Sequence, residues 1–157
     1  MAHEIERKFL VINDDWKAQI RNSAYYRQGY LAGNDRSSIR VRIGDDRAWL
    51  NIKSATLGIR RTEYEYAIPL GDAEEMLASL CQGAVIEKWR HFVPYAGHLW
   101  EIDVFEGDNQ GLVVAEIELD DEQQAFAKPT WLGDEVSDDP RYYNVCLVEH
   151  PYCDWDE

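Results

Sequence analysis

The sequence predicts a β-rich α+β protein, and three features of the chain indicate this class. Short segments that alternate polar with apolar residues dominate the chain, they are rich in Ile, Val, Tyr and Trp, and Gly, Asn and Asp separate them. Helical patterns are few and short. With 157 residues and 45% hydrophobic side chains, the chain is long enough to form one core. We therefore expect a single domain over residues 1–157, of which about 151–157 form an acidic tail.

Four stretches of the chain fit helices: residues 14–22, 72–83, 120–128 and about 139–148. In the second stretch, Asp72 opens a capping-box-like sequence, apolar residues follow at helical spacing, and Gly83 provides the stop. Pro129 ends the third stretch. In the fourth, Asp139 is a suitable N-cap and Pro140 a suitable first helical residue.

Charged side chains occupy alternate positions in seven of the β segments. Because successive side chains of a strand point to opposite faces, each charged set shares one face of its strand. In chain order the sets are Glu4, Glu6 and Lys8; Arg40 and Arg42; Lys53; Arg61, Glu63 and Glu65; Lys88 and Arg90; Glu101 and Asp103; and Glu116 and Glu118. The opposite faces carry mostly Ile, Val, Leu and Tyr.

Two arrangements fit this pattern. The charged faces are the solvated side of an ordinary sheet, which suffices for any single strand, or they line the water-filled lumen of a closed antiparallel barrel whose apolar outer faces are covered by helices. Like-sign neighbours such as Glu4 and Glu6, or Arg40 and Arg42, repel unless opposite charge lies between them. Seven such segments with few neutral polar residues favour the barrel, and the solvated sheet stays the alternative.

A lumen that gathers both carboxylates and cations has a natural shared ligand. Carboxylates prefer hard ions such as Mg²⁺ or Mn²⁺, whereas Arg and Lys bind phosphate oxygens. A chain of phosphates contacts both groups and replaces their repulsion by attraction. The pattern therefore indicates a divalent metal with a small polyanion, without selecting a substrate.

Composition and missing motifs exclude several other classes. The net charge of −14 argues against binding of nucleic acid over the general surface. The longest uncharged stretch, residues 76–86, is too short to span a bilayer, and no signal peptide is recognisable, so we expect a cytoplasmic protein with reduced cysteines. The chain has no P-loop, no H-E-x-x-H zinc motif and no G-x-S-x-G nucleophile motif.

The charged sets belong to a longer series of motifs. It begins with E-x-E-x-K at Glu4, Glu6 and Lys8. There follow, in order, Q-G-Y-L at 28–31, I-R-V-R at 39–42, L-N-I-K-S at 50–54, R-T-E-Y-E at 61–65, E-K-W-R at 87–90, E-I-D-V-F at 101–105, A-E-I-E at 115–118 and D-P-R-Y-Y-N at 139–144. This series resembles the CYTH superfamily, the triphosphate tunnel metalloenzymes, from residue 3 to about residue 148.

The resemblance implies an eight-stranded antiparallel β-barrel, open at both ends, with helices packed outside. It implies divalent metal, Mg²⁺ or Mn²⁺, on Glu4, Glu6, Asp103, Glu116 and Glu118. It implies a triphosphate clamp of Lys8, Arg40, Arg42, Lys53, Arg61, Lys88 and Arg90, to which Arg141 adds a C-terminal contact. Glu63, Glu65 and Glu101 are expected in the lumen without a defined role.

The family implies hydrolysis or cyclisation of triphosphate compounds. The segment at 28–31 resembles that of bacterial inorganic triphosphatases, so we expect hydrolysis of inorganic triphosphate at a terminal phosphorus. The attacking water is activated either by metal or by Tyr30 with Lys53 as a dyad. The alternatives are an adenylate cyclase, hydrolysis of an organic triphosphate such as a nucleoside or thiamine triphosphate, and a polyphosphate-binding module without catalysis. Trp and Tyr on the outer faces of the strands also suit a contact between two copies of the chain, so a homodimer is considered as well.

Overall fold

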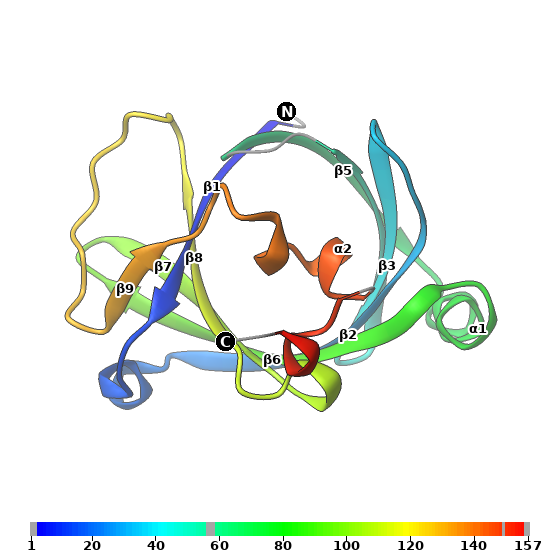
Figure 1. Cartoon of the computed structure of the whole chain (residues 1–157), viewed down its shortest axis with the longest axis horizontal. Coiled ribbons are helices and arrows are strands. Elements are labelled where there is room, and N and C mark those ends of the chain that lie inside the picture. The colour runs from blue at the N-terminus through cyan, green and yellow to red at the C-terminus, as the bar shows by residue number, and fades with distance from the viewer. Residues whose placement is uncertain (1–2, 56–58, 149, 156–157) are drawn as a thin grey trace.

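The computed structural model describes residues 3–55, 59–148 and 150–155. Their strands form one antiparallel sheet, in the order β5-β4-β3-β2-β6-β7-β8-β1-β9 with a further pairing of β5 with β1. The strands are β1 (His3–Val11), β2 (Asn22–Gly33), β3 (Ser37–Gly44), β4 (Arg47–Ser54), β5 (Arg60–Ile68), β6 (Gln82–Tyr95), β7 (His98–Phe105), β8 (Val113–Leu119) and β9 (Leu132–Glu135). Because β1 pairs with both β8 and β5, strands β1–β8 close into a barrel, and β9 lies outside it against β1 (Figure 1).

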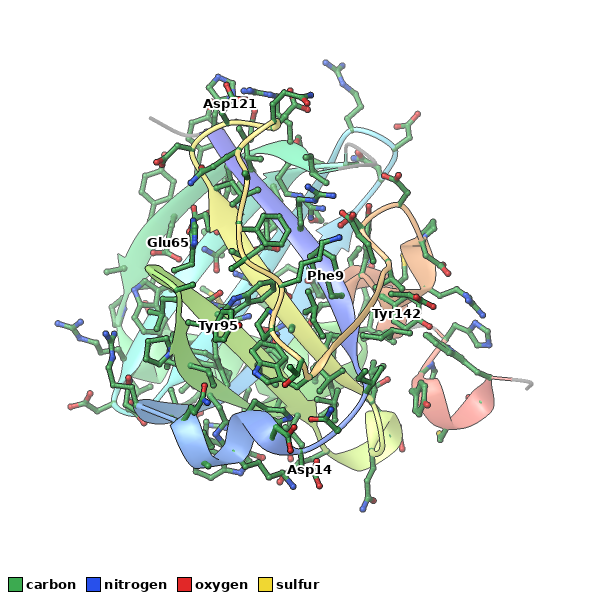
Figure 2. The ribbon with its side chains drawn as sticks, turned by 90° about the vertical axis from the view of Figure 1, so that its left-hand side faces the viewer. Phe9, Asp14, Glu65, Tyr95, Asp121 and Tyr142 are labelled. Atoms are coloured by element: carbon green, nitrogen blue, oxygen red, sulfur yellow. The ribbon has the colours of Figure 1, made fainter. Side chains whose placement is uncertain are left out.

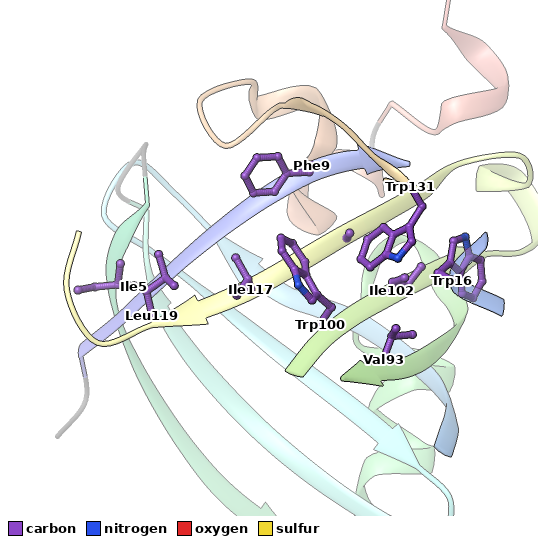
Figure 3. Packing of buried hydrophobic residues seen from close by; sticks show 10 residues of the cluster. Ile5, Phe9, Trp16, Val93, Trp100, Ile102, Ile117, Leu119 and Trp131 are labelled. Carbon is purple, nitrogen blue, oxygen red and sulfur yellow. The ribbon is translucent and has the colours of Figure 1, made fainter. Parts of the chain in front are cut away.

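The eight-stranded barrel confirms the fold predicted from the sequence, including the direction in which the charged faces point. The apolar faces of β1, β7 and β8 turn outward, where Phe9, Trp100 and Ile117 lie in a buried cluster with Trp16 and Trp131 (Figure 3). The loop that contains Asp121 crosses this outer wall near Phe9 (Figure 2). Aromatic contacts fix the loop there, since the ring of Phe126 lies 5.9 Å from that of Phe9 and 5.7 Å from that of Trp100. This part of the apolar core therefore lies outside the barrel wall.

Helix α1 (Leu70–Ser79) covers another part of the outer wall. Its buried residues Ala73 and Leu77 pack on Val41, Ile43 and Ala48 of β3 and β4. The helix begins two residues before the predicted start, directly after Pro69, and no side chain caps it. No helix among residues 3–55, 59–148 and 150–155 is both long enough and apolar enough to cross a membrane.

Two of the other helix predictions were wrong. Residues 14–22 contain only the 3₁₀ turn η1 (Asp15–Gln19), because Ile20 is already extended and Asn22 begins β2. Residues 120–128 contain no helix. There the side chain of Gln124 accepts the backbone N–H of Asp120, and the side chain of Asp121 accepts that of Gln123. Such local side-chain bonds to the backbone stabilise turns at the expense of a helix.

The predicted helix at 139–148 is interrupted. Asp139 is the expected cap, since its carboxylate accepts the backbone N–H of Arg141 at 3.1 Å. The chain then forms the 3₁₀ turn η3 (Pro140–Tyr142), becomes extended at Tyr143 and continues as the single helical turn α2 (Asn144–Leu147). Two further 3₁₀ turns are η2 (Gly107–Asn109) and η4 (Tyr152–Asp154).

This C-terminal segment, residues 140–148, lies within the ring of strands and not on its outside (Figure 1). Leu147 and Val148 pack in one buried cluster with Tyr30, Ile86 and Phe105. These three are inward positions of β2, β6 and β7, two residues along from charged or polar lumen positions. Helix α1 thus lies outside the barrel as expected, whereas the short turn α2 lies inside the ring of strands, where Leu147 and Val148 form an apolar plug in part of the lumen.

Candidate active site in the barrel lumen

The lumen contains a cavity of about 840 Å³. Every site residue predicted from the sequence lines it except Asp103 and Arg141. The lining members of that set are Glu4, Glu6, Lys8, Tyr30, Arg40, Arg42, Lys53, Arg61, Glu63, Glu65, Lys88, Arg90, Glu101, Glu116 and Glu118. Alternation along the strands thus placed these side chains on the correct face, and the closed barrel brings them together.

Asp103 and Arg141 lie elsewhere. Asp103 is fully buried beneath the lining, and both of its oxygens are occupied: Oδ1 accepts from Arg90 Nε at 2.8 Å, and Oδ2 accepts from Lys88 Nζ at 2.8 Å. In this arrangement it holds two cations, and it does not line the cavity. Arg141 pairs with Asp139 on the surface, with 54% of its side chain exposed. Its guanidinium lies outside the lumen.

One cluster of carboxylates fits a hard metal ion. Oxygens of Glu6, Glu101 and Glu116 lie within 4.8 Å of one another. The strand register produces the cluster, because Glu101 on β7 stands directly opposite Glu116 on β8, and β8 also pairs with β1. Burial and the nearby Glu116 raise the pKa of Glu6 to about 8. Three carboxylates this close together form the oxygen donor set that Mg²⁺ or Mn²⁺ prefers.

A second pair of carboxylates, Glu4 and Glu63, lies where β1 meets β5. Burial and hydrogen bonding to Glu63 raise the pKa of Glu4 to about 7. Burial opposes ionisation of Glu63 as well, yet Lys53, 3.3 Å away, and Arg40, 3.9 Å away, hold its pKa at about 2. Glu63 is thus the ionised partner of two clamp cations, and Glu4 is the member of the pair that carries the proton.

The cations of the lumen also lie close enough to one another to shift their pKa values. Burial and the charge of Arg40 lower the pKa of Lys53 to about 8. Burial, with Arg90 and Arg42 nearby, lowers the pKa of Lys88 to about 7 despite its bond to Asp103. Burial and the charges of Arg40 and Arg90 lower the pKa of Arg42 to about 10. A polyanion placed among these groups would relieve their repulsion and favour their charged forms.

The predicted dyad of Tyr30 and Lys53 lacks its expected contact. The ring of Tyr30 is buried in the apolar plug with Ile86 and Leu147. Among the residues that the structure describes, no hydrogen bond joins its hydroxyl to Lys53, whose ammonium pairs with Glu63.

Three amides, of which Asn51 and Gln28 are fully buried, were missed by the sequence analysis. Asn51 accepts from Arg40 Nε at 3.2 Å and donates to Glu63 and Glu65 at 3.1 and 2.8 Å. Gln28 and Asn144 form a second amide connection, which is taken up below. Asn51 and Gln28 occupy inward positions of the same alternating pattern, but a search for charged side chains passes over them. Their place in the alternation was the available signal.

Tyr143 is a further contact that the charged pattern did not reveal. Its ring lies 5.5 Å from Lys8 Nζ and 5.1 Å from Arg61 Cζ, close enough for cation–π attraction. Its hydroxyl donates to the carbonyl oxygen of Ser137 at 2.6 Å. Lys8 also donates to the carbonyl oxygen of Tyr142 at 3.1 Å. The C-terminal segment therefore contacts the clamp directly.

The raised pKa values of Glu4 and Glu6 predict how stability depends on pH without metal. Between pH 5 and 7 the folded protein holds protons on these groups that the unfolded chain, with ordinary values near 4.5, has released. We therefore expect the melting temperature of the metal-free protein to fall as the pH rises from 5 to 7, and Mg²⁺ to reduce that slope. Thermal unfolding in chelator and in Mg²⁺ measures this. A double variant Glu4→Gln and Glu6→Gln should flatten the metal-free slope, and a slope of opposite sign in the unaltered protein would contradict the assignment.

The fold and the site together define a barrel protein whose lumen holds a cavity lined by interleaved carboxylates and cations. The CYTH domain matches residues 2–143, and the chain belongs to this family. It is 48% identical over 157 residues to the inorganic triphosphatase of Acetivibrio thermocellus, covering 100% of both chains. It is 37% identical over 149 residues to that of Nitrosomonas europaea, covering 92% of this chain and 96% of the relative. A crystal structure described as an inorganic triphosphatase matches with a TM-score of 0.69 at 34% identity, covering 94% and 95% of the two chains.

Proposed function

We propose that the protein hydrolyses inorganic triphosphate inside its barrel with the aid of Mg²⁺ or Mn²⁺. The observation that carries this proposal is the presence of a carboxylate cluster and a set of crowded cations in a single cavity of about 840 Å³. Linear triphosphate has several negative charges, and its oxygens suit both groups. The relatives named inorganic triphosphatase at 48% and 37% identity support the same substrate.

The lumen residues divide into two roles. Glu6, Glu101 and Glu116 would hold the divalent ion, with Glu4 and Glu118 nearby on the same inner face. When bound, such an ion offsets charge on phosphoryl oxygens and lowers the pKa of water. This assignment puts Glu101 in the place that the sequence analysis gave to Asp103, whose oxygens are taken by Lys88 and Arg90.

The clamp cations bind the phosphates and stabilise the charge that develops on them. Arginine N–H groups donate to two oxygens at once, and in a buried lumen each such bond is stronger than in water. Arg40, Arg42 and Lys53 come from neighbouring strands β3 and β4, and Lys88 and Arg90 face them from β6. Since Lys53 and Lys88 have lowered pKa values, a bound polyanion also favours their protonation.

A substrate panel tests the proposal. With Mg²⁺ or Mn²⁺, purified protein should release phosphate from tripolyphosphate at least about 10-fold faster than from pyrophosphate, ATP or thiamine triphosphate. The reason is that the described lining of the cavity is dominated by charged groups suited to phosphates and metal. Phosphate release and cyclic AMP are measured in parallel. Faster turnover of ATP, cyclic AMP as the product, or binding of tripolyphosphate without turnover would each replace the proposal by one of the alternatives.

Other expectations from the sequence stay predictions. The cysteines Cys81, Cys146 and Cys153 form no disulfide with one another, as reduced thiols would. Large side chains such as Tyr64 and Tyr66 are exposed on the outer face of β5, where a homodimer contact would find apolar surface. A cytoplasmic location and the choice between Mg²⁺ and Mn²⁺ rest on the sequence alone.

A further inference from the structure

Two neutral amides connect two clamp cations through the C-terminal segment. Gln28 on β2 is fully buried, and its Oε1 accepts from Arg42 Nε at 3.1 Å. Its Nε2 donates to Oδ1 of Asn144 on α2 at 2.8 Å. The same Oδ1 accepts from Lys88 Nζ at 3.1 Å. A continuous hydrogen-bonded path therefore runs from Arg42 to Lys88 by way of Gln28 and Asn144.

The two cations allow only one orientation of each amide side chain. Arg42 can only donate, so it requires the oxygen of Gln28, and the amino group of Gln28 then faces away from it. That amino group requires an acceptor, which Asn144 supplies, and Lys88, another pure donor, uses the same oxygen. The two cations at the ends thus fix the orientation of both amides.

Arg42 differs from the other cations of the clamp because the group that fixes it is neutral. Lys53 pairs with Glu63, and both Lys88 and Arg90 pair with Asp103. Arg42 has no carboxylate within ion-pair distance among the residues that the structure describes; its contacts are Gln28 Oε1 and the ring of Tyr26, whose centroid lies 4.7 Å from Arg42 Cζ. An amide oxygen fixes a guanidinium in place without cancelling its charge, so that charge stays available to an anion.

We infer that Gln28 and Asn144 are a positioning pair that sets Arg42 at a fixed separation from Lys88, and leaves the charge of Arg42 uncompensated, to hold phosphate groups of one substrate molecule. The inference rests on the proposed function and adds a specificity element to it. Neither amide needs to touch the substrate. The C-terminal segment, which also plugs one end of the lumen, thereby becomes part of the binding site, since it supplies the oxygen that Lys88 and Gln28 share.

Substitutions at Asn144 separate position from charge. Asn144→Asp preserves the shape and the acceptor but adds a negative charge beside Lys88, whereas Asn144→Leu removes the acceptor. We expect each to raise the KM for tripolyphosphate by about 10-fold, the value of one hydrogen bond to a charged group, and to change kcat by less than about threefold. Gln28→Met, which removes both bonds of that side chain, should do the same. Calorimetric titration with tripolyphosphate in chelator measures the binding without turnover.

A matched control loosens the same segment from outside. Trp155 packs on Tyr142 and Tyr152, with ring centroids 5.1 and 4.9 Å apart, and is not among the residues that line the cavity. Trp155→Ala should lower the melting temperature and leave the KM within about twofold. If Asn144 had only a structural role, Asn144→Asp should give this same result.

The outcomes are decisive in both directions. Wild-type KM in Asn144→Asp and Gln28→Met would overturn the inference, and so would a raised KM in Asn144→Leu alone, because charge neutrality would then be irrelevant. An equal rise in KM in Trp155→Ala would assign the effect to the fold of the segment. If the unaltered protein neither binds nor hydrolyses tripolyphosphate, the proposed function itself has failed, which the titration of that protein reveals first.

Discussion

Replacing Glu6 by glutamine is expected to abolish hydrolysis and leave the fold intact. The side chain belongs to the three-carboxylate cluster, and loss of one carboxylate from a metal-binding set of this kind should reduce turnover of tripolyphosphate by at least about 100-fold. Burial and Glu116 already raise the pKa of Glu6 to about 8, so its ionised form is disfavoured in the metal-free protein. Glutamine resembles the protonated acid, and its melting temperature in chelator should equal or exceed that of the unaltered protein.

The surface pair of Arg60 and Glu122 provides the control for this experiment. Its side chains are 3.2 Å apart and about half exposed, and exposed pairs contribute little. Glu122→Gln should therefore alter neither turnover nor melting temperature. A fall of several degrees in Glu6→Gln without metal, or turnover within about 10-fold of the original, would show that Glu6 supports the barrel and not the reaction.

Replacing Arg90 by methionine should abolish hydrolysis and also destabilise the fold. Arg90 donates to both oxygens of the fully buried Asp103, at 2.8 and 2.9 Å. Removing one partner of a buried pair costs about 3–5 kcal/mol. We expect the lower end of this range here, because Lys88 still donates to Asp103. For a chain of this length that corresponds to a fall of roughly 10 °C in melting temperature. Turnover should fall by at least about 100-fold, because a clamp cation is lost.

A second substitution separates these two effects. Arg90→Met leaves the buried charge of Asp103 with Lys88 in place of two cations, and Asp103→Asn removes that charge, so the double variant should regain most of the lost melting temperature. It should not regain turnover, because the guanidinium is still missing. Thermal unfolding and phosphate release on the single and double variants measure both, with Arg60→Met as the surface control. Recovery of turnover together with stability would mean that Arg90 acts only by neutralising Asp103.

These contrasting expectations show what alternation along a strand can and cannot predict. It correctly places charged side chains on the inner face, because the direction of a side chain follows from its position alone. Glu101 and Asp103 share that face, so the sequence does not separate their roles. Their neighbours do: Glu101 stands opposite Glu116, whereas Asp103 stands opposite Arg90 on one side and Val114 on the other. That register depends on how the strands stagger around the barrel, which no single segment encodes.

The plug at one end of the lumen was missed for a different reason. Inward positions occupied by Ile86 and Phe105 are apolar, which breaks the charged pattern near one end of the barrel. This break was visible in the sequence, but only the folded chain shows that Leu147 and Val148 fill the space. The resemblance to the CYTH family implied a barrel open at both ends and therefore gave no reason to look for a plug.

The barrel closes through its first strand, and this arrangement has a consequence for biosynthesis. Glu6 stands opposite Glu118 on β8, and the seam to β5 is the short pairing of residues 3–5 with 60–62. Contacts so distant along the chain form late, because a long loop must be ordered before they bring any gain. Glu4 and Glu6 are synthesised first, but they can take their places in the barrel only after most of the chain has left the ribosome. We therefore expect the lumen cavity to form in the last step of folding.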